Sequence, residues 1–74
     1  MFVQVGAFAE RANAVNLARR LSEFSHSVIS AANINGRTLF RVRMGPIGDL
    51  EQADRLLTQV IAAGHNDARL IVAQ

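Results

Sequence analysis

Residues 28–43 have the sequence VISAANINGRTLFRVR, in which two runs of strand-like residues lie on either side of Asn35-Gly36. Asn-Gly between two such runs is a strong signal for a two-residue β-hairpin, because a type I′ turn needs positive φ at both central residues. The turn also fixes the register. One face of the hairpin is expected to carry the pairs Ile34/Arg37, Ala32/Leu39, Ser30/Arg41 and Val28/Arg43. The other face is expected to carry Ala31/Phe40 and Ile29/Val42.

A weak internal repeat surrounds this hairpin. Residues 3–8, VQVGAF, align with residues 42–47, VRMGPI, and the apolar residues that follow each segment recur at helical spacing. Each half of the chain therefore predicts a strand, a helix and a second strand.

Two amphipathic helices are expected. The first is predicted from residue 11 to residue 24, with an apolar stripe of Ala14, Leu17, Ala18, Leu21 and Phe24. The second is predicted to begin after the N-cap Asp49, with Gln52 three residues on, and to end before Gly64 at the C′ position. Its expected stripe consists of Leu50, Ala53, Leu56, Leu57, Val60 and Ile61.

The predicted order βαββαβ with a central hairpin favours an α+β, ferredoxin-like fold. In this fold a four-stranded antiparallel sheet carries both helices on one face and leaves the other face uncovered. We call the uncovered side the open face. The first and third strands are the central pair of this topology, so their outward side chains should lie together in the middle of the open face.

Strand alternation predicts which side chains reach the open face. If Val3, Val5 and Ala7 point inward, the first strand presents Phe2, Gln4, Gly6 and Phe8. The third strand presents Leu39, Arg41, Arg43 and Gly45, with Val28, Ser30, Arg69 and Ile71 on the flanks. Apolar patches with Gln and Arg forks suit a sugar polymer that has flat ring faces, acetyl groups and carboxylates.

Several of these residues have a second interpretation. Gly6 either lets a ligand approach the backbone or marks a bulge in the strand. Phe8 either contacts a ligand or packs over the start of the first helix, and Asn13 is equally an ordinary polar residue of a helical first turn. The two outward arginines also fit a solvated strand face.

Composition limits the function further. The 74 residues carry a formal net charge of +2 and no cysteine, and they suggest a single domain over residues 1–74 that forms part of a larger protein. His26 and His65 are isolated, and no metal-ligand spacing or phosphate-binding loop is present. We therefore expect no catalytic residue, no metal site, no cofactor and no membrane-spanning segment, and the sequence shows no signal peptide.

The two strand segments FVQVGAF, residues 2–8, and FRVRMGPI, residues 40–47, resemble the signature segments of SPOR (sporulation-related repeat) domains, and the likeness covers nearly the whole chain. Within that family the chain is most similar to the C-terminal domains of septal lytic transglycosylases of the cell envelope. Ile47 replaces the aromatic residue usual after Gly-Pro.

The resemblance implies a monomeric, non-catalytic module that binds peptidoglycan glycan strands lacking stem peptides, in the periplasm at the division septum. The glycan contacts that it implies are Gln4, Gly6, Phe8, Asn13, Ser30, Leu39, Arg41 and Arg43.

Two other classes of protein share the predicted fold. An RNA-recognition module would need aromatic residues interleaved on the third strand, where this chain has Leu39, Arg41 and Arg43, so no nucleic acid partner is expected. A protein-interaction or regulatory domain that pairs through its sheet remains an alternative, because fold alone does not fix function.

Overall fold

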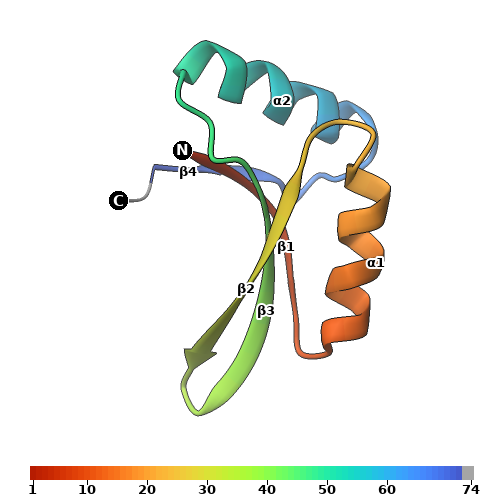
Figure 1. The fold of residues 1–74 in the computed structure, drawn as a ribbon, viewed down its shortest axis with the longest axis vertical. Coiled ribbons are helices and arrows are strands. Elements are labelled where there is room, and N and C mark those ends of the chain that lie inside the picture. Colours follow the sequence, from red (N-terminus) through yellow and green to blue (C-terminus); the bar gives the residue numbers. More distant parts are fainter. Residues whose placement is uncertain (73–74) are drawn as a thin grey trace.

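A computed structural model describes residues 1–72 and shows two helices and one four-stranded sheet (Figure 1). The elements in chain order are β1 (Phe2–Phe8), α1 (Arg11–Leu21), β2 (Ser27–Ile34), β3 (Arg37–Met44), α2 (Leu50–Ala62) and β4 (Arg69–Ile71). The strands are antiparallel in the order β2-β3-β1-β4, with β1 and β3 in the centre. The predicted ferredoxin-like fold is confirmed.

The β2–β3 hairpin has the predicted register. Asn35 and Gly36 have φ values of 52° and 78°, as a type I′ turn requires. Ile34 lies opposite Arg37, and the pairing continues without a shift to Ser27 opposite Met44. Because the register holds along the whole hairpin, Val42 and Met44 are fully buried on the helix side while Arg41 and Arg43 lie on the open face.

The predicted alternation of β1 holds as far as Val5, which is buried as expected, and is wrong from Gly6 onward. Gln4 lies opposite Arg43, but the register shifts at Val5, so that Gly6 lies opposite Val42, Ala7 opposite Arg41 and Phe8 opposite Phe40. One extra residue in β1 forms a β-bulge, and it exchanges the faces of every residue that follows. Gly6 and Phe8 therefore lie on the helix side, and Ala7 takes the open-face position.

Contacts of Gly6 and Phe8 agree with this reversed orientation. A Cβ atom built on Gly6 would lie 3.1 Å from Leu17 of α1 and 3.1 Å from the Phe8 ring. Phe8 itself packs against the hydrophobic core as a partly buried residue. Of the two interpretations of each residue, the structure supports the bulge for Gly6 and packing near the first helix for Phe8.

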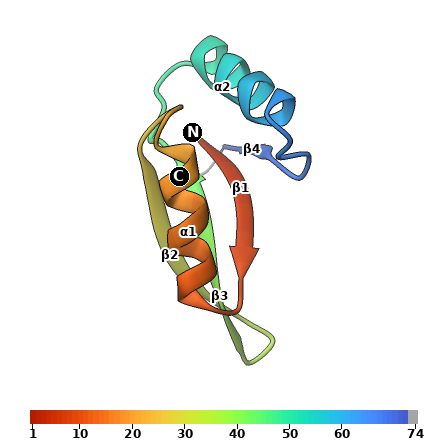
Figure 2. The same cartoon turned by 90° about the vertical axis from the view of Figure 1, so that its right-hand side faces the viewer.

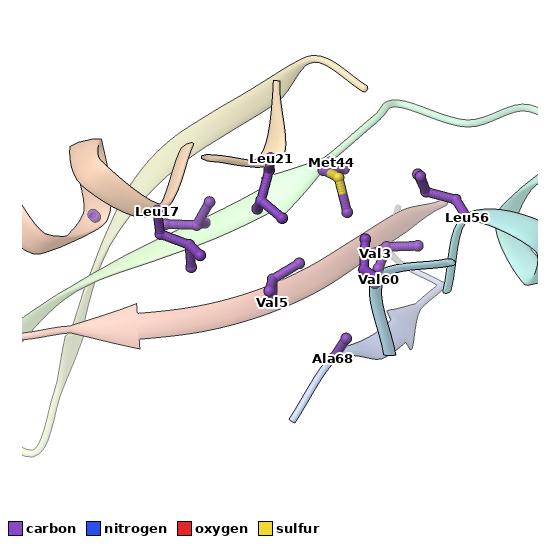
Figure 3. Packing of buried hydrophobic residues seen from close by; sticks show 10 residues of the cluster. Val3, Val5, Leu17, Leu21, Met44, Leu56, Val60 and Ala68 are labelled. Carbon is purple, nitrogen blue, oxygen red and sulfur yellow. The ribbon is translucent and has the colours of Figure 1, made fainter. Parts of the chain in front are cut away.

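The two helices divide the inner face of the sheet between them (Figure 2). Helix α1 packs against β1, β2 and β3, and α2 packs against β1 and β4. Their buried side chains meet those of the central strands in one core (Figure 3). Its buried members are Val3, Val5, Ala14, Leu17, Leu21, Val42, Met44, Leu56, Val60 and Ala68.

Helix α1 is shorter than predicted and ends at Leu21 instead of residue 24. The Ser22 hydroxyl donates a hydrogen bond of 2.6 Å to the Arg19 carbonyl, and the backbone N–H of Phe24 donates to the Leu21 carbonyl at 2.9 Å. A short side chain that binds a helical carbonyl competes with continuation of the helix. Phe24 still packs against the core, but from the loop that follows α1.

Helix α2 begins and ends as predicted. The Asp49 side chain accepts a 2.8 Å hydrogen bond from the backbone N–H of Glu51, and Gly64 has a positive φ of 107° just beyond the C-cap Ala63. The predicted apolar stripe is too wide, because Leu50 is 56% exposed and Ile61 is 40% exposed. Since α2 covers only β1 and β4, it buries a narrower seam of Ala53, Leu56 and Val60.

Candidate functional site

Gln4 and Arg43 face each other across the two central strands, and they form the centre of the open face. Arg43 Nε donates a 3.0 Å hydrogen bond to Gln4 Oε1, and the Arg43 guanidinium carbon lies 6.0 Å from the centroid of the Phe2 ring. Gln4 is only 7% exposed. Gln4 therefore holds Arg43 through a hydrogen bond from a buried position, and its contact with a ligand stays a prediction.

Arg41 lies two residues before Arg43 on β3, on the same face. Its Nη2 atom donates a 3.3 Å hydrogen bond to the hydroxyl of Ser30, its cross-strand neighbour on β2. Its Nε atom is buried and has no hydrogen-bond partner. A buried donor without a partner costs free energy, so the Arg41 side chain is held in its place at a local cost in stability.

The charges of the chain are separated between the sheet and the other elements. Four of the eight arginines lie in strands, namely Arg37, Arg41, Arg43 and Arg69. All six acidic residues lie outside the strands, at Glu10, Glu23, Asp49, Glu51, Asp54 and Asp67. Although the net charge is only +2, the sheet therefore carries only positive side-chain charge.

Electrostatic conditions at Arg43 favour an incoming anion. Desolvation by burial lowers the pKa of Arg43, and the positive charge of Arg41 lowers it further. The hydrogen-bond partners of the two guanidinium groups, Gln4 and Ser30, are both neutral. A carboxylate placed between the arginines would offset the repulsion between their charges.

The structure brings together most of the predicted site residues, but not all of them. Gln4, Ser30, Leu39, Arg41 and Arg43 share the open face, with Ser30 and Leu39 on the hairpin beside the arginines. The bulge removes Gly6 and Phe8 from that face. Asn13 is exposed in the first turn of α1, within the helix layer on the other side of the sheet.

Two parts of the surface were missed by sequence reasoning. Ala7 is exposed opposite Arg41, and it gives the open face a flat position beside that guanidinium. A hollow of about 430 Å³ lies along β1, where the three-residue β4 no longer covers its edge. The hollow is lined by residues 4–8 with Asp67 and Arg69. The bulge turns Ala7 outward, and the shortness of β4 leaves the edge of β1 uncovered. Apart from Gly6, the sequence has no clear signal for the bulge or for the length of β4.

Residues 1–72 contain no group of three or more His, Cys, Asp or Glu side chains that could hold a metal ion. No helix within the described part of the chain is long and apolar enough to cross a membrane.

Comparison with known proteins identifies the fold and its relatives. A protein-family model described as "SPOR domain" matches residues 1–70 of the chain. The crystal structure of the RlpA SPOR domain from Pseudomonas aeruginosa is similar to this chain, with a TM-score of 0.87 and 32% sequence identity over 97% of each chain. No curated protein sequence matches the chain.

An open sheet face lined by oriented arginines, on a small α+β domain, defines a binding module. The chain belongs to the SPOR domain family. Its members are peptidoglycan-binding modules without catalytic activity of their own. Among SPOR domains the sequence most resembles those of the rare lipoprotein A type, and the match to the RlpA SPOR domain confirms this likeness.

Proposed function

We propose that the open face binds peptidoglycan glycan strands from which the stem peptides have been removed, and that this binding directs a larger envelope protein to the division septum. The observation that carries the proposal is the pair of arginines on the open face, Arg41 and Arg43. Each guanidinium is hydrogen-bonded to a neutral partner, Ser30 for Arg41 and Gln4 for Arg43.

The chemistry of the glycan distinguishes the two forms of the strand. In an intact strand the lactyl group of muramic acid is joined to the stem peptide by a neutral amide. Removal of the peptide leaves a carboxylate directly on the sugar. Because Arg41 and Arg43 offer guanidinium donors from a sheet whose strands contain no acidic residue, they favour the charged form.

The shape of the face adds a steric preference. Ala7 leaves space beside Arg41, and Leu39 provides apolar surface on the projecting hairpin. A sugar chain without peptide branches can lie close to such a surface. A stem peptide on each muramic acid would hold the strand away from the short side chain of Ala7.

Targeting follows from where such strands occur. The resemblance to SPOR domains implies that strands without stem peptides occur at the division septum, so a module that recognises them would concentrate its parent protein there. Cleavage of the glycan, if the parent performs it, belongs to a neighbouring domain. The module contributes binding and location.

Calorimetric titration with three purified ligands tests the proposal. The ligands are denuded glycan strands, strands of equal length with stem peptides, and chitooligosaccharides, which lack the lactyl group. We expect denuded strands to bind at least about tenfold more tightly than either of the others. Equal affinity for denuded and peptide-bearing strands would refute the specificity, and preferential binding of single-stranded RNA would refute the ligand class.

A further inference from the structure

A second surface is formed by the free edge of β2 together with α1, which covers the helix side of the sheet. It differs from the arginine pair in chemistry. Strand β2 pairs with β3 on one side only, and it lies at the edge of the sheet. Its sequence, SVISAANI, contains no charged residue and no proline. Charged residues and prolines usually protect an edge strand against pairing with another chain. The edge of β2 has neither and is therefore unprotected.

The register shows which backbone groups are available at that edge. A two-residue hairpin turn makes Ile34 and Arg37 a hydrogen-bonded pair, so the residues at even positions of β2 bond to β3. The hydrogen bond from the N–H of Gly45 to the carbonyl of His26, at 3.3 Å, follows the same alternation. The N–H and C=O groups of residues 27, 29, 31 and 33 therefore face outward.

A hollow of about 540 Å³ lies beside this edge, between β2 and the C-terminal half of α1. Its apolar lining consists of Val15, Ala18 and Ile29. Its polar lining consists of Arg19, Ser22, Ser25, His26 and Ser27. The hollow thus combines an apolar floor with basic groups and lacks any acidic side chain.

Ser27 provides an independent sign of a missing partner. Its hydroxyl is buried and has no hydrogen-bond partner, although Ser27 lines the hollow and begins the free edge. Buried hydroxyl groups are normally satisfied.

We propose that β2 and α1 form a docking groove for an extended peptide segment of another protein, which adds to the sheet as a fifth strand. Main-chain hydrogen bonds to residues 27, 29 and 31 would hold the segment. One apolar side chain would enter the hollow between Val15, Ala18 and Ile29, and a carboxylate two residues along the segment would face Arg19 and His26.

Charge favours a foreign peptide over a second copy of this chain. A second copy would bring its own β2 to the edge, and that strand has no acidic residue to meet Arg19 and His26. A partner segment with Asp or Glu beside an apolar residue supplies the missing charge. The hollow lies on the helix side of the sheet, so the anchoring side chains of the peptide and the glycan would contact opposite faces.

A symmetric probe peptide, acetyl-Thr-Asp-Thr-Val-Thr-Asp-Thr-amide, tests the groove by NMR titration of the labelled domain. The symmetry places a carboxylate beside Val in either strand direction. We expect binding with a Kd near or below about 1 mM and amide shifts at residues 27, 29 and 31. A peptide with Asn in place of both Asp residues should bind at least about fivefold more weakly.

Matched variants distinguish binding in the groove from a general effect of the positive charge on α1. Arg19→Glu should weaken binding by at least about tenfold, whereas Arg20→Glu, on the same exposed helix end but outside the hollow, should change it less than about twofold. Ala31→Pro should also weaken binding, because it removes an outward N–H while leaving the bonds to β3. All three variants should retain glycan binding.

Three outcomes would overturn the proposal. They are equal effects of Arg19→Glu and Arg20→Glu, peptide-induced shifts confined to Arg41 and Arg43, and shifts along β2 that grow with protein concentration alone. The last result would assign the edge to self-association. Since the glycan titration is independent, failure of this proposal leaves the proposed function standing.

Discussion

Gln4 and Arg43 lie opposite each other on the two central strands, and the amide oxygen of Gln4 accepts a 3.0 Å hydrogen bond from Arg43 Nε. Gln4 is almost fully buried by its neighbours on the open face. The pair fixes a guanidinium in place before any ligand arrives, and preorganisation of this kind reduces the entropic cost of binding.

Replacing Gln4 with alanine should release Arg43 from this orientation. We expect Gln4→Ala to weaken binding of denuded glycan by about tenfold and to lower the free energy of unfolding by about 1 kcal/mol, the contribution of one hydrogen bond. Calorimetry and urea denaturation measure the two effects. Gln59→Ala, at an exposed position of α2, is the control and should change neither quantity.

Arg41→Ala should weaken glycan binding with little change in stability. The substitution removes a buried, unpaired Nε atom but also the 3.3 Å hydrogen bond to Ser30, and these two effects oppose each other, so the free energy of unfolding should change by less than about 1 kcal/mol. Affinity should fall by at least about tenfold and its salt dependence should decrease, since one ion pair with the glycan is lost. Arg55→Ala on α2 is the matched control, and an equal loss of affinity there would argue against a specific contact.

The bulge at Val5 is tested by substitutions at two adjacent residues of β1. Gly6→Val should lower the free energy of unfolding by about 1–3 kcal/mol, because its side chain would overlap Leu17 and the Phe8 ring. Ala7→Leu, on the open face, should leave stability nearly unchanged but reduce glycan binding. The reverse pattern of stability would show that β1 alternates regularly.

The narrow buried seam of α2 gives a matched pair of charge substitutions. Leu56→Asp should prevent folding, because it places an unpaired charge in the core at a cost of about 4 kcal/mol or more. Leu50→Asp, at an exposed position in the first helical turn, should be nearly neutral. Circular dichroism of both variants during thermal denaturation distinguishes them.

The hairpin and the helices could be predicted from sequence because their signals are local. Asn35-Gly36 fixes a turn type, and the turn fixes the partner of Arg41 as Ser30. Apolar spacing and the Asp49 cap likewise identify α2. These features depend on residues close together in the chain.

The reversed faces of Gly6 and Phe8 could not be predicted in the same way. The bulge depends on the packing of β1 between β3 and α1, which are distant from it in the sequence. From the sequence, Gly6 indicates a bulge only as one of two interpretations. The width of the buried seam of α2 also depends on which strands the helix covers. Sequence periodicity overestimated it at Leu50 and Ile61.

Binding at the open face is tested most directly by NMR titration of the labelled domain with denuded glycan strands, with peptide-bearing strands as the control. We expect saturable shifts from denuded strands at Gln4, Ala7, Ser30, Leu39, Arg41 and Arg43, with little change at Gly6, Phe8 and Asn13 beyond what neighbouring residues transmit. Shifts of equal size from both glycans, or shifts centred on the helices and absent from Arg41 and Arg43, would contradict this prediction.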